Sequence, residues 1–145
     1  MFSQKNQKFM TLDIHIKQGI GDIKFQMPID DVIAILGETP EVETIDNAVD
    51  ETTTVLRYTN GMTFFFEGDN QNLTCIDISN PDITLFGKKI FDLSEKEIVN
   101  LMVENKYFEQ DVDNEDWGER RVTFNEANID FYFEDEELQS VIIGG

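Results

Sequence analysis

The sequence predicts an α+β fold made of two tandem copies of one unit, each a helix plus an antiparallel β-meander. Three observations predict this fold. Apolar and turn positions recur at a spacing of about 66 residues, several short segments alternate apolar with polar residues, and two segments carry an apolar stripe at helical spacing. A unit of about 65 residues buries too little surface to be stable alone. We therefore expect the two units to share one continuous sheet with the helices on one face.

The repeat is visible as matched positions along the chain. Gly21 precedes Gly87 by 66 residues, and five apolar positions between residues 25 and 36 have apolar counterparts at the same spacing. The run Phe-Phe-Phe-Glu at 64–67 meets Phe-Tyr-Phe-Glu at 131–134, a spacing of 67. These matches predict an N-terminal tail over residues 1–11, a first unit over 12–80 and a second unit over 81–145.

The first unit begins with an extended segment over residues 12–16, where apolar and polar residues alternate as in a half-buried strand. A helix follows, with Pro28 near its start and Gly37 at its end. Asn60-Gly61 is a strong signal for a two-residue β-hairpin. The meander of this unit is predicted to have strands at 54–59, 62–67 and 73–79.

The second unit follows the same plan. Residues 82–85 form the extended segment, and Ser94 with Glu97 three residues later predicts a capping box at the start of a helix. Ile98, Leu101 and Met102 make the apolar stripe of that helix. Its meander is predicted to have strands at 120–125, 129–134 and 138–143.

The middle strand of each meander places one aromatic residue on the face away from the helix. Strand alternation puts Phe65 in the first unit and Tyr132 in the second on that face, beside acidic neighbours. An exposed face of this kind is a docking surface for a basic protein, because aromatic residues are enriched at interface centres. The alternative is a second small core or ordinary cross-strand pairing.

The charge of the chain restricts its partners. It carries 11 basic and 30 acidic residues, a formal net charge of −19. Nucleic acid and anionic membranes are not expected as partners, since binding to phosphates depends on Lys and Arg. A basic protein is the natural complement, because opposite fields steer the two molecules together. The alternative is that the acidity only keeps the protein soluble.

Residues 107–137 concentrate this charge, with twelve acidic residues against two arginines. We interpret the part before residue 120 as an acidic loop and its Trp117 as an interface anchor; the alternative is a solvated loop whose tryptophan folds back on the core. The spacing of Asp111, Asp113 and Glu115 suggests a calcium loop, but the required glycine and final glutamate are replaced by Asp116 and Val122, so no metal site is expected. The candidate partner-binding residues are Glu109, Asp111, Asp113, Glu115, Asp116, Trp117 and Tyr132.

Catalysis is not expected. His15 is the only histidine, and Cys75 lies in a predicted strand without a basic neighbour that could activate it. The sequence has no glycine-rich phosphate loop and no cysteine–histidine metal spacing, so no cofactor is expected either. A single cysteine, a start without an apolar run and the lack of any segment of about 20 apolar residues predict a soluble, cytoplasmic protein.

Residues 21–40 resemble a recurring bacterial signature, in which a strand ending in Gly-Met is followed by a short helix closing on Leu-Gly-x-Pro. The stretch is similar to the repeat unit of the β-lactamase inhibitory protein family and of the SmpA/OmlA envelope lipoproteins. Gln26 replaces the usual glycine, and the chain lacks the disulfides, the export signal and the lipid-anchored cysteine of these proteins. Inhibition of a β-lactamase is therefore not expected. The resemblance implies a two-copy sheet used as a protein-binding surface.

Together these observations predict a non-catalytic, protein-binding module. Its most specific form is an immunity protein that neutralises a basic toxin domain such as a nuclease, by analogy with other small acidic bacterial proteins. Two alternatives remain open: a structural or regulatory domain whose acidity serves solubility, and a nucleic-acid mimic whose carboxylates imitate phosphates.

Overall fold

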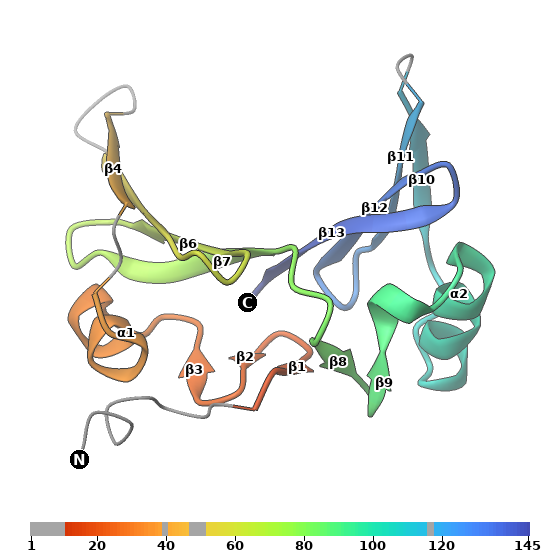
Figure 1. Cartoon of the computed structure of the whole chain (residues 1–145), viewed down its shortest axis with the longest axis horizontal. Helices are drawn as coiled ribbons and strands as arrows, with labels where there is room; N and C mark the ends of the chain where they lie inside the picture. The colour runs from red at the N-terminus through yellow and green to blue at the C-terminus, as the bar shows by residue number, and fades with distance from the viewer. Residues whose placement is uncertain (1–10, 39–40, 47–51, 116–117) are drawn as a thin grey trace.

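The computed structural model describes residues 11–38, 41–46, 52–115 and 118–145 (Figure 1). Of these residues, 48% lie in strands and 17% in helices. The strands form one sheet of eight and one of five. No helix in the described ranges is long and apolar enough to cross a membrane. The division into a tail and two units at residues 11 and 80 stays a prediction.

The predicted α+β class, with two tandem units of a helix plus a meander, is wrong. The described part of the chain is mostly β-structure, with two sheets and only two short α-helices. Sequence patterns missed the second sheet because its strands are two or three residues long. The extended segments predicted at 12–16 and 82–85 contain two of its strands, Asp13–His15 and Thr84–Leu85, but so short a segment does not show which strand it pairs with. The two helices gave clear apolar stripes and were given too much weight.

The eight-stranded sheet is antiparallel throughout, in the order β10-β11-β12-β13-β7-β6-β5-β4. The pairing of β13 with β7 joins four strands from each half of the chain into one sheet. Its strands are β4 (Glu41–Asp46), β5 (Thr52–Arg57), β6 (Met62–Glu67), β7 (Asn72–Ile78), β10 (Asp111–Asn114), β11 (Glu119–Phe124), β12 (Ile129–Glu134) and β13 (Glu137–Gly144).

The five-stranded sheet also draws on both halves, in the order β3-β2-β1-β8-β9. The β1–β8 pair is parallel, and the other pairs are antiparallel. Gly19 permits the tight turn of this sheet: its φ is +146°, and a Cβ there would lie 1.9 Å from the carbonyl oxygen of Ile23. The strands are β1 (Asp13–His15), β2 (Gly19–Ile20), β3 (Ile23–Lys24), β8 (Thr84–Leu85) and β9 (Lys88–Lys89).

Helix α1 spans Ile29–Leu36, helix α2 spans Glu95–Glu104, and a 3-10 turn, η2, spans Ile90–Asp92. α1 ends at Gly37, whose N–H donates to the carbonyl of Ile33 at 2.7 Å. The capping box predicted for α2 is confirmed. The Glu97 N–H donates to the Ser94 hydroxyl at 3.2 Å, and the Ser94 N–H donates to the Glu97 carboxylate at 2.9 Å.

Ser94→Ala is expected to lower the free energy of unfolding by about 1 kcal/mol at neutral pH, because one helix N–H loses its acceptor. The Ser94 backbone N–H, and after it the Ser94 hydroxyl, also hold the pKa of the Glu97 carboxyl below its usual value, and Ser94→Ala removes only the second of these bonds. The stabilisation linked to Glu97 is therefore present above its unfolded pKa and is lost as the pH falls through the folded pKa. Urea unfolding across pH 3–7 should show a shallower acid-side decline in Ser94→Ala than in Ser94→Thr, which keeps the hydroxyl.

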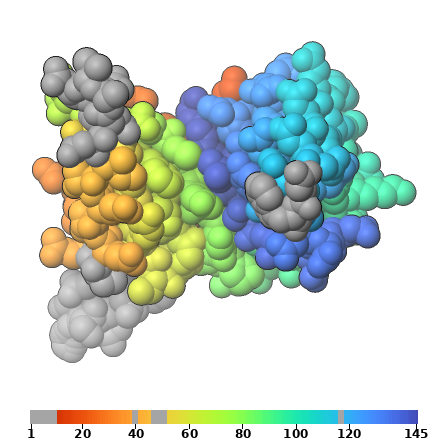
Figure 2. All heavy atoms as spheres, turned by 90° about the horizontal axis from the view of Figure 1, so that it is seen from above, coloured from red at the N-terminus to blue at the C-terminus, as the bar shows by residue number. Residues whose placement is uncertain are grey.

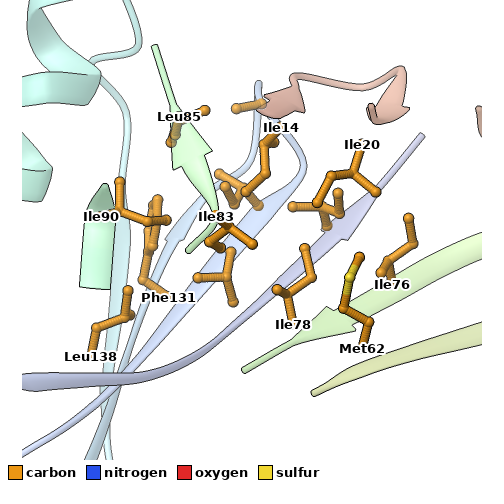
Figure 3. Close-up of a cluster of buried hydrophobic side chains, with 14 of the residues drawn as sticks. Ile14, Ile20, Met62, Ile76, Ile78, Ile83, Leu85, Ile90, Phe131 and Leu138 are labelled. Carbon is orange, nitrogen blue, oxygen red and sulfur yellow. The ribbon is translucent and has the colours of Figure 1, made fainter. Parts of the chain in front are cut away.

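Both helices and the five-stranded sheet lie on one face of the eight-stranded sheet (Figure 1). One core of buried aliphatic and aromatic side chains fills the space between them. Ile14 and Ile20 of the small sheet face Met62, Ile76 and Ile78 of the large sheet (Figure 3). All the large hydrophobic residues on this side of β6 and β12 are fully or almost fully buried. No helix or strand within the described ranges covers the opposite face of the large sheet.

Candidate functional site

The face of the eight-stranded sheet opposite the helices is the candidate binding face. Both ends of the sheet rise on the side away from the helices, so this face is concave (Figure 1), and Figure 2 looks onto it. No described helix or strand covers it. The concave face is formed by Glu41 and Glu43 of β4, Val55 and Arg57 of β5, Thr63, Phe65 and Glu67 of β6, Cys75 and Asp77 of β7, Asp111 and Asp113 of β10, Arg121 and Thr123 of β11, Asp130 and Tyr132 of β12, and Ile142 of β13.

Strand alternation positions its two aromatic residues. In β6 the neighbours Phe64 and Phe66 are fully buried in the core, while Phe65 points the other way and is partly exposed. In β12, Tyr132 has the same position between buried Phe131 and Phe133. The prediction that Phe65 and Tyr132 lie on the face away from the helices is therefore confirmed.

Phe65 also takes part in the cross-strand pairing that was the alternative interpretation. It lies opposite Val55 on one side and Cys75 on the other. Val55 is 0% exposed although it lies on the concave face, so this end of the face contains a small apolar cluster. The concave face is thus partly apolar, as the centre of a protein interface is.

One row of residues crosses the whole concave face from edge to edge. Successive strand pairs place them directly opposite one another in the order Asp111, Thr123, Asp130, Ile142, Asp77, Thr63, Arg57 and Glu41. Neighbouring strands lie about 4.8 Å apart. The carboxylates of Asp111, Asp130 and Asp77, on alternate strands, are therefore spaced about 10 Å apart along the row.

The arginines of the concave face form ion pairs with carboxylates of its two edge strands. Arg57 forms an ion pair with Glu43 of the edge strand β4 at 2.8 Å. At the other end Arg121 forms an ion pair with Asp113 of the edge strand β10 and bonds to the hydroxyl of Tyr132. Both guanidinium groups therefore lie away from the central strands β7 and β13.

Neither Asp77 of β7 nor Asp130 of β12 forms an ion pair with a residue that the structure describes. Asp130 accepts a hydrogen bond from the Thr123 hydroxyl. Asp77 makes no side-chain hydrogen bond or ion pair with any described residue, and partial burial raises the pKa of its carboxyl. A partly buried carboxylate without a compensating donor is costly. The centre of the concave face would gain from a cation supplied by another molecule.

The pKa of Cys75 reflects the burial and the negative charge of the same region. Burial, and to a lesser extent the carboxylates of Asp77, Glu67 and Asp130, together raise the pKa of its thiol from 9.0 to about 11. An activated nucleophile needs the opposite shift. His15 cannot serve as its base, because it lies on β1, in the small sheet on the other side of the core.

Alkylation of Cys75 by iodoacetamide at pH 8 is expected to be about 100-fold slower than that of an unperturbed thiol, since the pKa is raised by about two units. Asp77→Asn should accelerate the reaction by removing a nearby negative charge. Asp22→Asn, a matched change in an exposed turn of the small sheet, should leave the rate unchanged. Mass spectrometry of the alkylated protein over time measures the rate. A rate equal to that of a free thiol would show that Cys75 is not shielded in this way.

The structure brings three of the predicted partner-binding residues together. Asp111, Asp113 and Tyr132 lie on the concave face, and Arg121 contacts both Asp113 and Tyr132. Glu109 and Glu115 flank β10, and no side-chain hydrogen bond or ion pair joins either to the described part of this face. Asp116 and Trp117 lie outside the described residues.

The predicted acidic loop is in part a strand. Asp111–Asn114 forms β10, the edge strand of the large sheet, because its acidic residues alternate with Val112 and Asn114 and pair regularly with β11. Sequence reasoning also missed Asp77 and Asp130. Their positions in the alternating strands, two residues from Cys75 and from Tyr132, were the signal that could have placed them on this face. No group of three or more His, Cys, Asp or Glu side chains among the described residues could hold a metal ion.

Comparisons with known proteins add no function. No family model matches the chain, and no curated protein matches it. A similar solved structure is the 1.5 Å crystal structure of an extracellular protein containing an SCP domain from Bacillus anthracis strain Ames, with 11% identity and a TM-score of 0.45. The match covers 89% of this chain and 49% of that one, so the chain spans about half of its length. This likeness bears neither on function nor on the resemblance to the inhibitory-protein family, which stays a prediction.

Proposed function

We propose that this chain is a non-catalytic binding module whose concave face binds a basic protein. The observation that carries the proposal is the distribution of charge on that face. Asp77 of the central strand β7 and Asp130 of β12, the neighbour of β13, form no ion pair with a described residue, while Arg57 and Arg121 are held by carboxylates at the edges. A lysine or arginine of a partner would compensate the central carboxylates at the place where the face is most concave.

The apolar residues of the concave face support a protein partner over a free cation. Phe65 and Tyr132 lie on either side of the central strands, and Ile142 lies between Asp130 and Asp77 in the row. Aromatic residues near the centre of an interface contribute much of its binding energy, and the surrounding polar residues exclude water. The net charge of −19 adds long-range steering of a basic partner.

The specific form that we propose is an immunity protein that neutralises a basic toxin domain, such as a nuclease. A wide acidic face can cover a basic active-site surface without any chemistry of its own. This step depends on the nature of the partner, which must be toxic when the binding module is absent. The alternative of a structural or regulatory domain requires no such partner, and its acidity would serve solubility.

The nucleic-acid mimic is less well supported by the geometry. Along the row the carboxylates of Asp111, Asp130 and Asp77 are spaced about 10 Å apart. A DNA strand carries one phosphate per about 3.4 Å of helix axis. The row is therefore too sparse to reproduce a phosphate backbone, and it fits isolated lysine or arginine side chains better.

A pull-down from a lysate of the source organism tests the proposal, with three forms of the chain as bait. The concave-face variant is Asp77→Asn with Asp130→Asn. The matched control is Asp22→Asn with Glu104→Gln, two exposed residues in the small sheet and in α2. Both variants lose two negative charges, so long-range steering changes equally and only the contacts differ.

We expect the wild type and the control to capture one basic protein that is released as salt rises, and the concave-face variant to lose it. Expression of that protein alone should arrest growth, and co-expression of this chain should restore it. Equal capture by both variants would place binding outside the concave face. A captured protein that is harmless when expressed alone would favour the regulatory alternative.

A further inference from the structure

We propose that the outer edge of β10 binds an extended basic segment of the partner, which adds a ninth strand to the eight-stranded sheet. The inference rests on the proposed function, from which it takes the basic charge of the partner. It adds to the concave face a second contact, which the backbone of β10 makes. β10 is the terminal strand of the sheet, and no described strand pairs with its outer edge. An unpaired edge is a template for strand addition by another chain.

The hydrogen-bond pattern shows which backbone groups are available. The Glu115 N–H donates to the carbonyl of Glu119 at 2.7 Å, which makes these two residues a hydrogen-bonded pair. Hydrogen-bonded and non-hydrogen-bonded pairs alternate along antiparallel strands. Asp113 and Asp111, opposite Arg121 and Thr123, therefore bond inward to β11. The N–H and C=O groups of Val112 and Asn114 point to the outer edge.

The side chains of β10 determine which residue types an added strand would need. Asp111 and Asp113 lie on the concave face, whereas Val112 lies on the other face and is 40% exposed. Residues directly opposite one another in neighbouring strands have Cβ atoms about 5 Å apart. An added strand would therefore place lysine or arginine beside the two carboxylates and an apolar residue beside Val112. The segment has basic and apolar residues in alternation.

A second copy of this chain does not fit the edge. Pairing β10 with another β10 would bring four carboxylates together on one face, and like charges opposite one another are destabilising. Charged residues on edge strands protect proteins from edge-to-edge association in this way. The same charges select a basic strand, so protection from self-association and specificity for the partner have one cause.

Two six-residue peptides test the proposal on the full chain. One alternates valine and lysine, and the other has three valines followed by three lysines, so that composition and charge are identical. A third peptide has the alternating sequence with N-methyl groups on the amides that would face β10. The protein variant is Val112→Pro, because the Val112 N–H points outward and its loss spares the pairing of β10 with β11. Backbone NMR resonances follow binding and the folding of the variant.

We expect the alternating peptide to bind about tenfold more tightly than the block peptide and to protect the Val112 and Asn114 amides from hydrogen exchange. N-methylation and Val112→Pro should each remove that difference. Equal affinity of all three peptides would overturn strand addition and leave the proposed basic partner intact. If no peptide bound at low salt, the edge contact would be contradicted, and the proposed function would still be decided by the pull-down with the concave-face variant. If Val112→Pro did not fold, the N-methylated peptide would decide alone.

Discussion

Replacing Phe131 with alanine is expected to lower the free energy of unfolding by about 3–5 kcal/mol, the cost of deleting a buried aromatic ring and leaving a cavity. Phe131 is 0% exposed and lies at the centre of β12. Its ring packs edge-on against Phe124 at a centroid distance of 6.1 Å, and it is tilted by 31° to the ring of Phe133 at 6.5 Å. A domain of this size is stable by about 5–15 kcal/mol, so the variant should lose a large fraction of its stability.

Chemical unfolding followed by circular dichroism measures this loss. The matched control is Phe108→Ala, since Phe108 is 59% exposed in the segment that leads into β10 and its removal should change stability by about 0.5 kcal/mol or less. A loss below about 1 kcal/mol in Phe131→Ala would mean that the core between the two sheets is not closely packed. A similar loss in both variants would mean that Phe108 is buried in solution.

The elements with long periodic patterns could be predicted from the sequence. The strands β6 and β12 follow from their alternation, and Asn60-Gly61 lies in the turn between β5 and β6. The expected two-residue hairpin is wrong, because the Tyr58 N–H donates to the Met62 carbonyl at 3.0 Å and residues 59–61 form the loop. The start of α2 followed from the Ser94 and Glu97 pair, because a capping box is a local arrangement of two side chains. In these cases the residues that determine the element lie within it or beside it.

The five-stranded sheet could not be predicted in this way. Its strands have two or three residues, and its central contact joins β1 to β8 in parallel across 71 residues of sequence, from Asp13 to Thr84. A non-local contact of this kind leaves no periodic signal. The close approach of the backbone at Gly19 is equally invisible until the partner, Ile23, is placed beside it.

Only part of the candidate site could be predicted, because the rest also depends on contacts between distant parts of the sequence. Tyr132 could be placed on the outer face because one strand determines its direction. Asp77 and Asp130 belong to different halves of the chain, and only the pairing of β13 with β7 places them in one row. Asp111 and Asp113 were assigned to a loop because four residues give little strand signal among so many charges. Which residues share the concave face is therefore determined by the pairing and register of the strands, and the composition does not reveal these.

Replacing Tyr132 with alanine is expected to weaken binding of the basic partner by about 30-fold or more, which corresponds to about 2 kcal/mol. Tyr132 lies on β12, the third strand counted from the β10 edge, opposite Arg121 of β11, and is partly exposed on the concave face. Its removal takes apolar contact area from the interface. It also loosens the Arg121 guanidinium near a basic partner, because the hydroxyl bond is lost and only the ion pair with Asp113 still holds that group. Both effects weaken the complex.

Titration calorimetry with the purified partner measures the change, and two further variants separate its causes. Tyr132→Phe keeps the ring and loses the hydroxyl, so it should retain most of the affinity if apolar contact dominates. Tyr107→Ala removes an aromatic residue beside the five-stranded sheet, where it stacks on Phe86, and should bind as the wild type does. If Tyr107→Ala weakened binding more than Tyr132→Ala, the partner would occupy the side of the small sheet, and the concave face would have to be explained by its effect on solubility alone.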